Sequence, residues 1–159
     1  MRGASFTVPL LAIGCGVLIL LFHFVWKYFH TRSLPMDELE GHEFESYCAD
    51  LLQASDFQDV RITKGSGDFG TDILAIKDGI SYAVQCKRYD KPVGVFAVQQ
   101  IYAGRDYYGC MVGAVMTNQT FTPAAKDCAK KLRILLWDRS KIEEMQQWQE
   151  RAFSHRKKS

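Results

Sequence analysis

Three residues near the middle of the chain have the chemistry of a metal-dependent hydrolase: Asp72, Gln85 and Lys87. A hard cation such as Mg²⁺ takes oxygen ligands and keeps several of its waters. The Asp72 carboxylate and the Gln85 amide oxygen are ligands of this kind, and the backbone carbonyl of Cys86 lies at the same level of its strand. A lysine beside them could orient or deprotonate a water and counter charge on a phosphoryl group. The combination predicts hydrolysis of a phosphodiester.

A β-hairpin is predicted to bring these residues to one face of a sheet. Residues 71–76 and 80–87 are rich in Ile, Leu, Val, Ala and Tyr, and the strong turn dipeptide Asp78-Gly79 lies between them. With this dipeptide as the loop, Asp72 faces Gln85, with β-carbons roughly 5 Å apart. The lysine shares the face of Gln85 because side chains alternate along a strand.

A helix predicted over residues 36–54 precedes the hairpin, with apolar residues at helical spacing. If this helix packs beside the hairpin, Glu45 reaches the metal or its water. Glu43 is the alternative acid on the same helix.

The remaining elements predict one α/β domain with a mixed sheet. Thr122 and Pro123 suit the start of a helix, and Ser140 with Glu143 has the pattern of a capping box. The predicted elements are a strand over 60–63, a helix from 95 to about 104 or beyond, a strand over 110–116, a helix over 123–132, a strand over 134–137 and a last helix after residue 140.

The N-terminal segment is predicted to be a membrane anchor. Residues 6–29 contain no acidic residue and are long enough for the roughly 20 residues that cross a bilayer, with Trp26 and Tyr28 at one end. A cleaved signal peptide is the alternative, but the run is too long and no small-x-small site follows it. Lys27 near the end of the run and Arg32 beyond it outnumber Arg2 before it, which favours a cytoplasmic domain. We therefore expect a single-pass protein of the cytoplasmic (inner) membrane.

The length of 159 residues allows one anchor and one domain. We assign residues 1–35 to the anchor and a short linker, and residues 36–159 to the domain with a basic tail. Apart from Arg2 and Lys27, basic and acidic residues are equal in number, so bulk charge does not indicate a nucleic-acid binder. The five cysteines form no CxxC pair, which argues against a disulfide framework and a structural zinc site.

Four segments, in this order, resemble the Mrr-type restriction endonuclease domain, a QxK variant of the PD-(D/E)xK nuclease superfamily. The resemblance covers roughly residues 41–145. The four segments are Gly41–Glu45, Gly65–Ile73, Val84–Tyr89 and Phe121–Ala125.

The resemblance implies a restriction-endonuclease-like mixed sheet flanked by helices and a nuclease that acts on DNA, often modified or foreign DNA. It implies Mg²⁺ as the cofactor, with Mn²⁺ as a substitute, and no organic cofactor. Glu45, Asp72, Gln85 and Lys87 would occupy the catalytic positions, and Gln99 resembles a recurrent polar position. A homodimer is left open, and a membrane helix stands where such enzymes usually carry a target-reading domain.

Two other functions remain open from the residues alone. Gln85 is neutral, which weakens metal affinity, so the domain could hold nucleic acid or a partner without cutting. A weaker alternative is an assembly protein that self-associates through the helix of Trp148.

Several other features suit structural roles better than chemical ones. Asp68-Phe69-Gly70 spells a kinase triplet, but the other kinase motifs are missing, and Asp68 is expected to cap the turn, with a second metal ligand as the alternative. His42 and His155 are interpreted as surface residues. Lys126, Lys130 and Arg133 follow one helical face that suits either solvent or phosphates.

Overall fold

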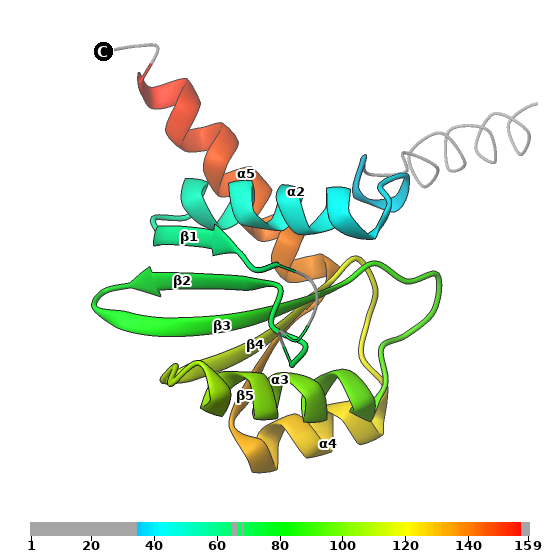
Figure 1. The fold of residues 1–159 in the computed structure, drawn as a ribbon. Helices are drawn as coiled ribbons and strands as arrows, with labels where there is room; N and C mark the ends of the chain where they lie inside the picture. The colour runs from blue at the N-terminus through cyan, green and yellow to red at the C-terminus, as the bar shows by residue number, and fades with distance from the viewer. Residues whose placement is uncertain (1–34, 65–66, 68, 157–159) are drawn as a thin grey trace, which may run out of the picture. The chain divides into compact units, whose positions relative to one another are not determined.

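The computed structural model describes residues 35–64, 67 and 69–156 (Figure 1). The chain divides into two units between Leu34 and Pro35. The predicted anchor, residues 6–29, lies outside the described residues. Among the residues that are described, no helix is both long and apolar enough to cross a membrane.

The described domain alternates strands and helices in the predicted order. Its elements are η1 (Pro35–Asp37), α2 (Gly41–Ala54), β1 (Gln58–Ile62), β2 (Ile73–Lys77), β3 (Ile80–Lys87), α3 (Val95–Tyr107), β4 (Val112–Thr117), α4 (Pro123–Leu132), β5 (Ile134–Trp137) and α5 (Arg139–Arg156).

The five strands form one mixed sheet in the order β1-β2-β3-β4-β5. The first three strands are antiparallel neighbours, and β3, β4 and β5 are parallel. Parallel strands need a crossover, and α3 and α4 supply the two crossovers. The mixed sheet predicted from the sequence is therefore confirmed.

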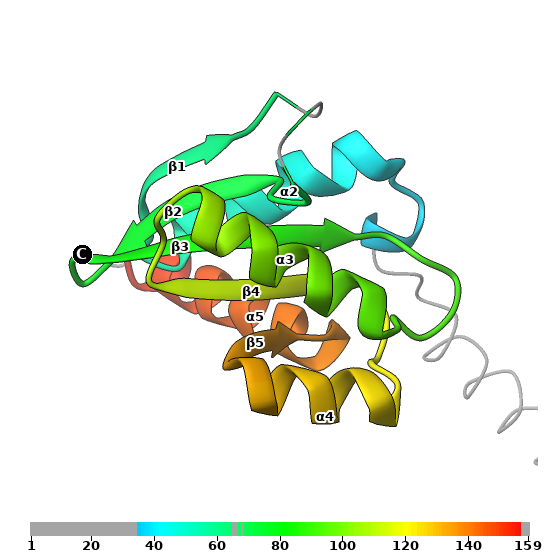
Figure 2. The same ribbon diagram turned by 60° about the horizontal axis from the view of Figure 1, so that its bottom comes forward.

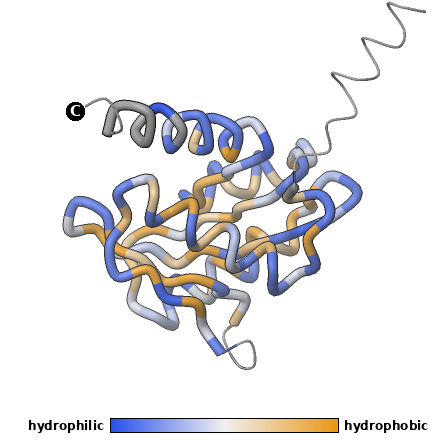
Figure 3. Tube along the Cα trace, turned by 90° about the horizontal axis from the view of Figure 1, so that it is seen from above, coloured by the Kyte–Doolittle hydropathy of each residue, from blue (hydrophilic) through white to orange (hydrophobic). Residues whose placement is uncertain are grey.

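Helices cover both faces of the sheet. α2 and α5 lie on one face and α3 and α4 on the other (Figures 1 and 2). The core under α3 and α4 consists of small and branched apolar residues, including Ala83, Val98 and Val115. The central strands are largely hydrophobic and much of the described part of α5 is hydrophilic (Figure 3). The sheet is thus the middle layer of three.

The hairpin has the predicted register. Lys77 pairs with Ile80 and Leu74 pairs with Ala83 around the Asp78-Gly79 turn. Both turn residues have left-handed backbones, with φ of 53° and 76°, as a two-residue hairpin loop that matches the twist of its strands requires.

The edge strand β1 is irregular and exposed. Its pairing with β2 shifts register between Gln58 and Arg61, and Asp59 between them has a left-handed φ of 50°. An extra residue of this kind is a β-bulge, which bends the strand and interrupts its ladder.

Two helix starts differ from the prediction. α2 begins at Gly41 rather than residue 36, because Glu40 and Glu43 form a reciprocal capping box. α5 begins at Arg139, and Asp138 takes the capping position, accepting hydrogen bonds from Ser140 Oγ and Lys141 N. The capping box predicted from Ser140 and Glu143 is therefore wrong, because Asp138 lies closer to the free amides.

Candidate active site

The hairpin positions Asp72 immediately before β2, next to the end of β3. Asp72 N donates to Val84 O at 2.9 Å, although Val84 is already paired with Ile73, so the regular ladder ends at Ile73. The Asp72 carboxylate accepts a hydrogen bond from Cys86 N at 2.6 Å through Oδ2. Within a strand, the N–H and C=O of one residue point to the same side, so the Cys86 carbonyl also lies on the Asp72 side of β3.

Gln85 is fully buried, at 0% exposure. Its Nε2 donates to Gln100 Oε1 of α3 at 3.0 Å. Its Oε1 is buried and has no hydrogen-bond partner among the described residues. A buried polar oxygen without a partner costs about 1–3 kcal/mol. The amide is thus held by its nitrogen and keeps its oxygen available for a ligand.

Two glycines let α3 and the loop before Asp72 approach closely enough to form this arrangement. A Cβ on Gly70 would lie 2.7 Å from Gln85 Nε2 and 2.8 Å from Gln100 Cβ. A Cβ on Gly104 would lie 2.2 Å from Thr71 Oγ1. Gly70 also has a φ of 77°, which a glycine adopts without strain.

Glu45 lies on the α2 side of the same strand end, half-buried and with interactions of its own. The pKa of the Cys86 thiol is raised well above its ordinary value by its hydrogen bond to Cys48, then by burial and by the charges of Cys48, Asp72 and Glu45. Both carboxylates therefore act on the same thiol, which stays protonated, and they converge on the end of β3.

Glu45 and Glu43, the alternative acid on the same helix, have different roles in the structure. The Glu43 carboxylate accepts a hydrogen bond from Glu40 N at 2.8 Å in the α2 capping box. Glu43 thus stabilises the helix start, whereas Glu45 lies close enough to Cys86 for its charge to raise the pKa of that thiol.

Lys87 ends β3 as a half-buried residue. Its backbone carbonyl accepts a hydrogen bond from Thr117 Oγ1 at 2.6 Å, which ties the strand end to β4. Its ammonium has no ion-pair partner within the described part of the chain. The charge is therefore available to a substrate.

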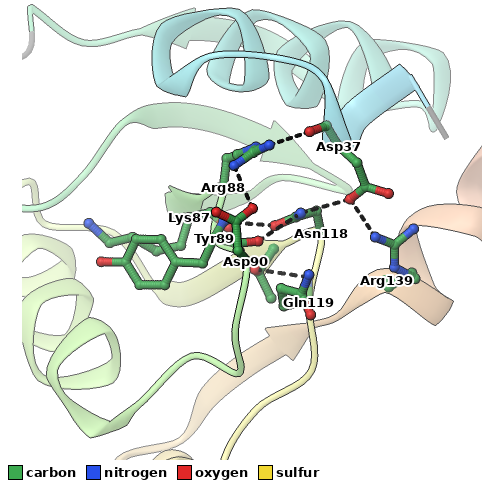
Figure 4. Close-up of polar contacts among 9 residues, drawn as sticks. Asp37, Lys87, Arg88, Tyr89, Asp90, Asn118, Gln119 and Arg139 are labelled. Carbon is green, nitrogen blue, oxygen red and sulfur yellow. Dashed lines mark hydrogen bonds and ion pairs between the residues drawn. The ribbon is translucent and has the colours of Figure 1, made fainter. Parts of the chain in front are cut away.

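The residue after Lys87 belongs to a separate polar network. Arg88 donates to the Asp37 carbonyl and pairs with Asp90 at 2.8 Å. Asn118, only 1% exposed, donates to Asp37 Oδ1 at 2.8 Å, and Arg139 pairs with the same oxygen at 2.5 Å. In Figure 4 the Lys87 side chain points away from this network.

Gln100, rather than Gln99, is the polar residue of α3 that contacts the site. Gln99 is exposed, whereas Gln100 is half-buried and hydrogen-bonded to Gln85. The prediction of Gln99 was wrong by one residue. One residue of a helix is a 100° rotation, and in a Gln-Gln pair no composition signal distinguishes the two.

The remaining predicted residues do not converge on the site. His42, Lys126, Lys130 and Arg133 are exposed. Asp68 lies outside the described residues, and so does the His155 side chain.

The donor set fits a hard divalent cation. It comprises two carboxylates, the partnerless amide oxygen of Gln85 and a backbone carbonyl, all oxygen ligands. The described residues contain no group of three or more His, Cys, Asp or Glu side chains that could hold a metal. Any ion here would therefore depend on the neutral oxygens of Gln85 and Cys86.

Comparison with protein families gives one match: the model Mrr_cat, described as "Restriction endonuclease", matches residues 36–146. No curated protein matches the chain.

Several solved structures are similar to this chain. The DNA modification-dependent restriction endonuclease AspBHI is 17% identical, with a TM-score of 0.52 over 65% of this chain and 30% of that chain. The restriction endonuclease MspJI, in complex with a 27-mer oligonucleotide, is 16% identical, with a TM-score of 0.50 over 79% of this chain and 30% of that chain. A protein of unknown function, AF1548, is 25% identical, with a TM-score of 0.48 over 59% of this chain and 55% of that chain. This chain thus spans less than two thirds of each.

Proposed function

The chain belongs to the restriction endonuclease family, and on that premise we propose that it is a Mg²⁺-dependent endonuclease that hydrolyses phosphodiester bonds in DNA. The observation that carries the proposal is the buried Gln85 amide. Its oxygen has no partner among the described residues, and it shares a strand end with the Asp72 carboxylate and the Lys87 ammonium.

Asp72, Gln85, the Cys86 carbonyl and Glu45 would hold the cation. When bound, such an ion polarises a phosphoryl oxygen and lowers the pKa of a water. Gln100 holds the Gln85 amide so that its nitrogen is occupied and its oxygen is presented. Lys87 counters the negative charge that develops on the phosphoryl group and orients the attacking water.

The test is cleavage of plasmid DNA by the purified full-length chain. We expect cleavage with Mg²⁺ or Mn²⁺ and none with EDTA, and we expect Asp72→Asn to abolish it. Asp127→Asn is the matched control, because Asp127 is an exposed carboxylate on α4. Cleavage by Asp72→Asn at the control's rate would exclude Asp72 from the mechanism.

We further propose that the substrate is modified or foreign DNA. The support is that AspBHI, which shares the fold, is a modification-dependent restriction endonuclease. A panel of methylated and plain DNA of identical sequence tests this. Equal rates on both would contradict selection by modification.

Residues 6–29 are proposed to anchor the enzyme in the cytoplasmic membrane, with the domain on the cytoplasmic side. The support is the long acid-free apolar run with basic residues after it. Alkaline extraction of membranes, followed by protease protection of the domain, tests both parts. Release at high pH would contradict the anchor.

A binding module without catalysis is the second candidate. It is favoured by the small number of acidic ligands among the described residues. Titration calorimetry with Mn²⁺ and DNA separates the two functions: DNA binding without metal binding or product supports the module.

A further inference from the structure

A hollow lies at the end of the sheet opposite the candidate site. It has a volume of about 410 Å³ and lies between the end of α2, the hairpin and α5. Tyr82, near the start of β3, lines it, whereas Lys87 ends the same strand. Its size is within the range of small-molecule sites, roughly 300–1,000 Å³.

Three aromatic rings form one wall of this hollow. The Phe57 ring contacts Tyr82 and Trp137 edge-on, with centroids 5.2 and 6.0 Å apart. Tyr82 and Trp137 are stacked with centroids 6.3 Å apart. Phe57 is 8% exposed and Trp137 is 9% exposed, so the wall is rigid.

A fourth aromatic residue, Trp148 of α5, also lines the hollow but is 53% exposed. An indole in this position leaves a large apolar surface in water beside the aromatic wall. A flat ring bound here would cover that surface and gain stacking contacts.

The hollow carries charges of both signs, because Lys77 and Lys141 line it together with Asp56 and Glu144. Lys77 Nζ donates to Ser55 O at 2.8 Å and lies 4.9 Å from the Phe57 ring centroid, so the ammonium is held at the wall. Lys141 pairs with Glu144 at 2.8 Å. That pair is solvent-exposed and therefore weak, so Lys141 can exchange Glu144 for an anionic ligand.

One buried hydroxyl completes the lining. Ser55 Oγ is buried and has no hydrogen-bond partner among the described residues.

We infer that this hollow binds a nucleotide, with the base stacked on Trp148 and the aromatic wall and the phosphate on Lys77 and Lys141. An organic cation is disfavoured, because the Lys77 ammonium already occupies the Phe57 face. A purely apolar ligand would leave that ammonium without an ion-pair partner among the described residues. The same chemistry is offered by a free nucleotide and by the phosphorylated end of a DNA strand.

The experiment is calorimetric titration of the full-length chain with deoxyadenosine monophosphate in EDTA. We expect saturable binding, about tenfold weaker for Trp148→Ala, since stacking on one aromatic residue contributes about that much to base binding. Trp148→Phe should restore part of the loss, and Lys141→Gln should weaken binding several-fold. Tyr107→Ala is the matched control, because Tyr107 is 61% exposed on α3 and does not line the hollow.

A second arm uses a short oligonucleotide with a 5′ phosphate. If the oligonucleotide competes with the mononucleotide and also depends on Trp148, the hollow accepts strand ends. If only the mononucleotide binds with that dependence, the hollow accepts free nucleotides. Both results support the inference.

Two results would overturn it. One is the absence of saturable mononucleotide binding by the wild-type chain, and the other is equal affinity of Trp148→Ala and the wild type. A failure of this inference can be distinguished from a failure of the nuclease proposal, because the two sites are mutated independently. Asp72→Asn should bind the mononucleotide normally, and Trp148→Ala should cut DNA at the wild-type rate.

Discussion

Lys87 and Arg88 are adjacent in the chain and similar in charge, yet their surroundings are opposite. Both terminal nitrogens of Arg88 are bonded, to Asp37 and Asp90, although its Nε is buried without a partner among the described residues. The Lys87 ammonium has no ion-pair partner in the described part of the chain, and Gln85 beside it has a partnerless buried oxygen. Polar groups that are satisfied within the fold stabilise it, whereas the Gln85 oxygen, buried without a partner among the described residues and beside an unpaired ammonium, is a candidate for ligand binding.

The largest expected effect is on catalysis. Lys87→Ala should lower the cleavage rate on the order of a hundredfold or more, because it removes a charge that stabilises the transition state. Its free energy of unfolding should change by less than about 0.5 kcal/mol. Plasmid cleavage and urea unfolding measure the two. Lys91→Ala, an exposed lysine four residues on, is the matched control. A large loss of stability in Lys87→Ala would show that Lys87, like Arg88, stabilises the fold.

The polar network should respond in the opposite way. Asp37→Ala should lower the free energy of unfolding by about 2 kcal/mol, because Asn118 and Arg139 lose a charged acceptor. Cleavage per folded molecule should stay near the wild-type value. Urea unfolding and cleavage assays test this, with Asp90→Ala as the control because its carboxylate is exposed. A loss of cleavage rate without a loss of stability would contradict the distinction between the Asp37 network and the candidate active site.

Replacement of the Gln85 amide should abolish activity without lowering stability. Gln85→Leu removes a buried oxygen without a partner, so we expect the free energy of unfolding to rise by about 1 kcal/mol or stay level. Cleavage should be lost, because a ligand oxygen is gone. Thermal unfolding with and without Mn²⁺ also distinguishes the wild type from the variant. Mn²⁺ should raise the Tm of the wild type but not that of Gln85→Leu. A destabilised variant would mean that the amide is structural.

The support of that amide should have a smaller effect. Gln100→Ala frees the Gln85 side chain, and we expect about a fivefold loss of rate, equivalent to one hydrogen bond of about 1 kcal/mol. Gln99→Ala is the matched control and should cut normally. If Gln99→Ala were the slower variant, the packing of α3 against the hairpin would have to be revised.

The smallest effect is on the pH dependence of stability. Burial alone would raise the pKa of Asp37, but hydrogen bonds from Asn118 and Arg139, with the charges of Arg139 and Arg88, hold it below its ordinary value of 3.8. The folded form therefore binds the proton less tightly, so the contribution of Asp37 is complete above that value and falls as the pH drops below it. Urea unfolding from pH 3 to pH 6 should show the wild type and Asp37→Asn converging toward the acid end. Parallel curves would exclude this linkage.

Local signals predicted the hairpin and missed what depends on distant packing. The Asp78-Gly79 turn determines the register, so the pairs Leu74–Ala83 and Ile76–Ser81 could be predicted from the sequence alone. The predicted pair Asp72–Gln85 lies one residue beyond the last observed pair, Ile73–Val84. Which of Gln99 and Gln100 contacts Gln85 depends on how α3 is rotated against β3. The sequence cannot indicate this rotation, because the two neighbouring residues are both glutamine. The network around Asp37 joins residues 81 and 102 positions apart, and no short-range pattern reports such contacts.

The bulge in β1 has a consequence for self-association. A straight, unpaired edge strand would offer its backbone amides and carbonyls to a second molecule, and the two sheets could merge into one. The kink at Asp59 interrupts that row of groups, and Arg61 places a charge on the exposed rim. Two copies of this protein should therefore not join through β1.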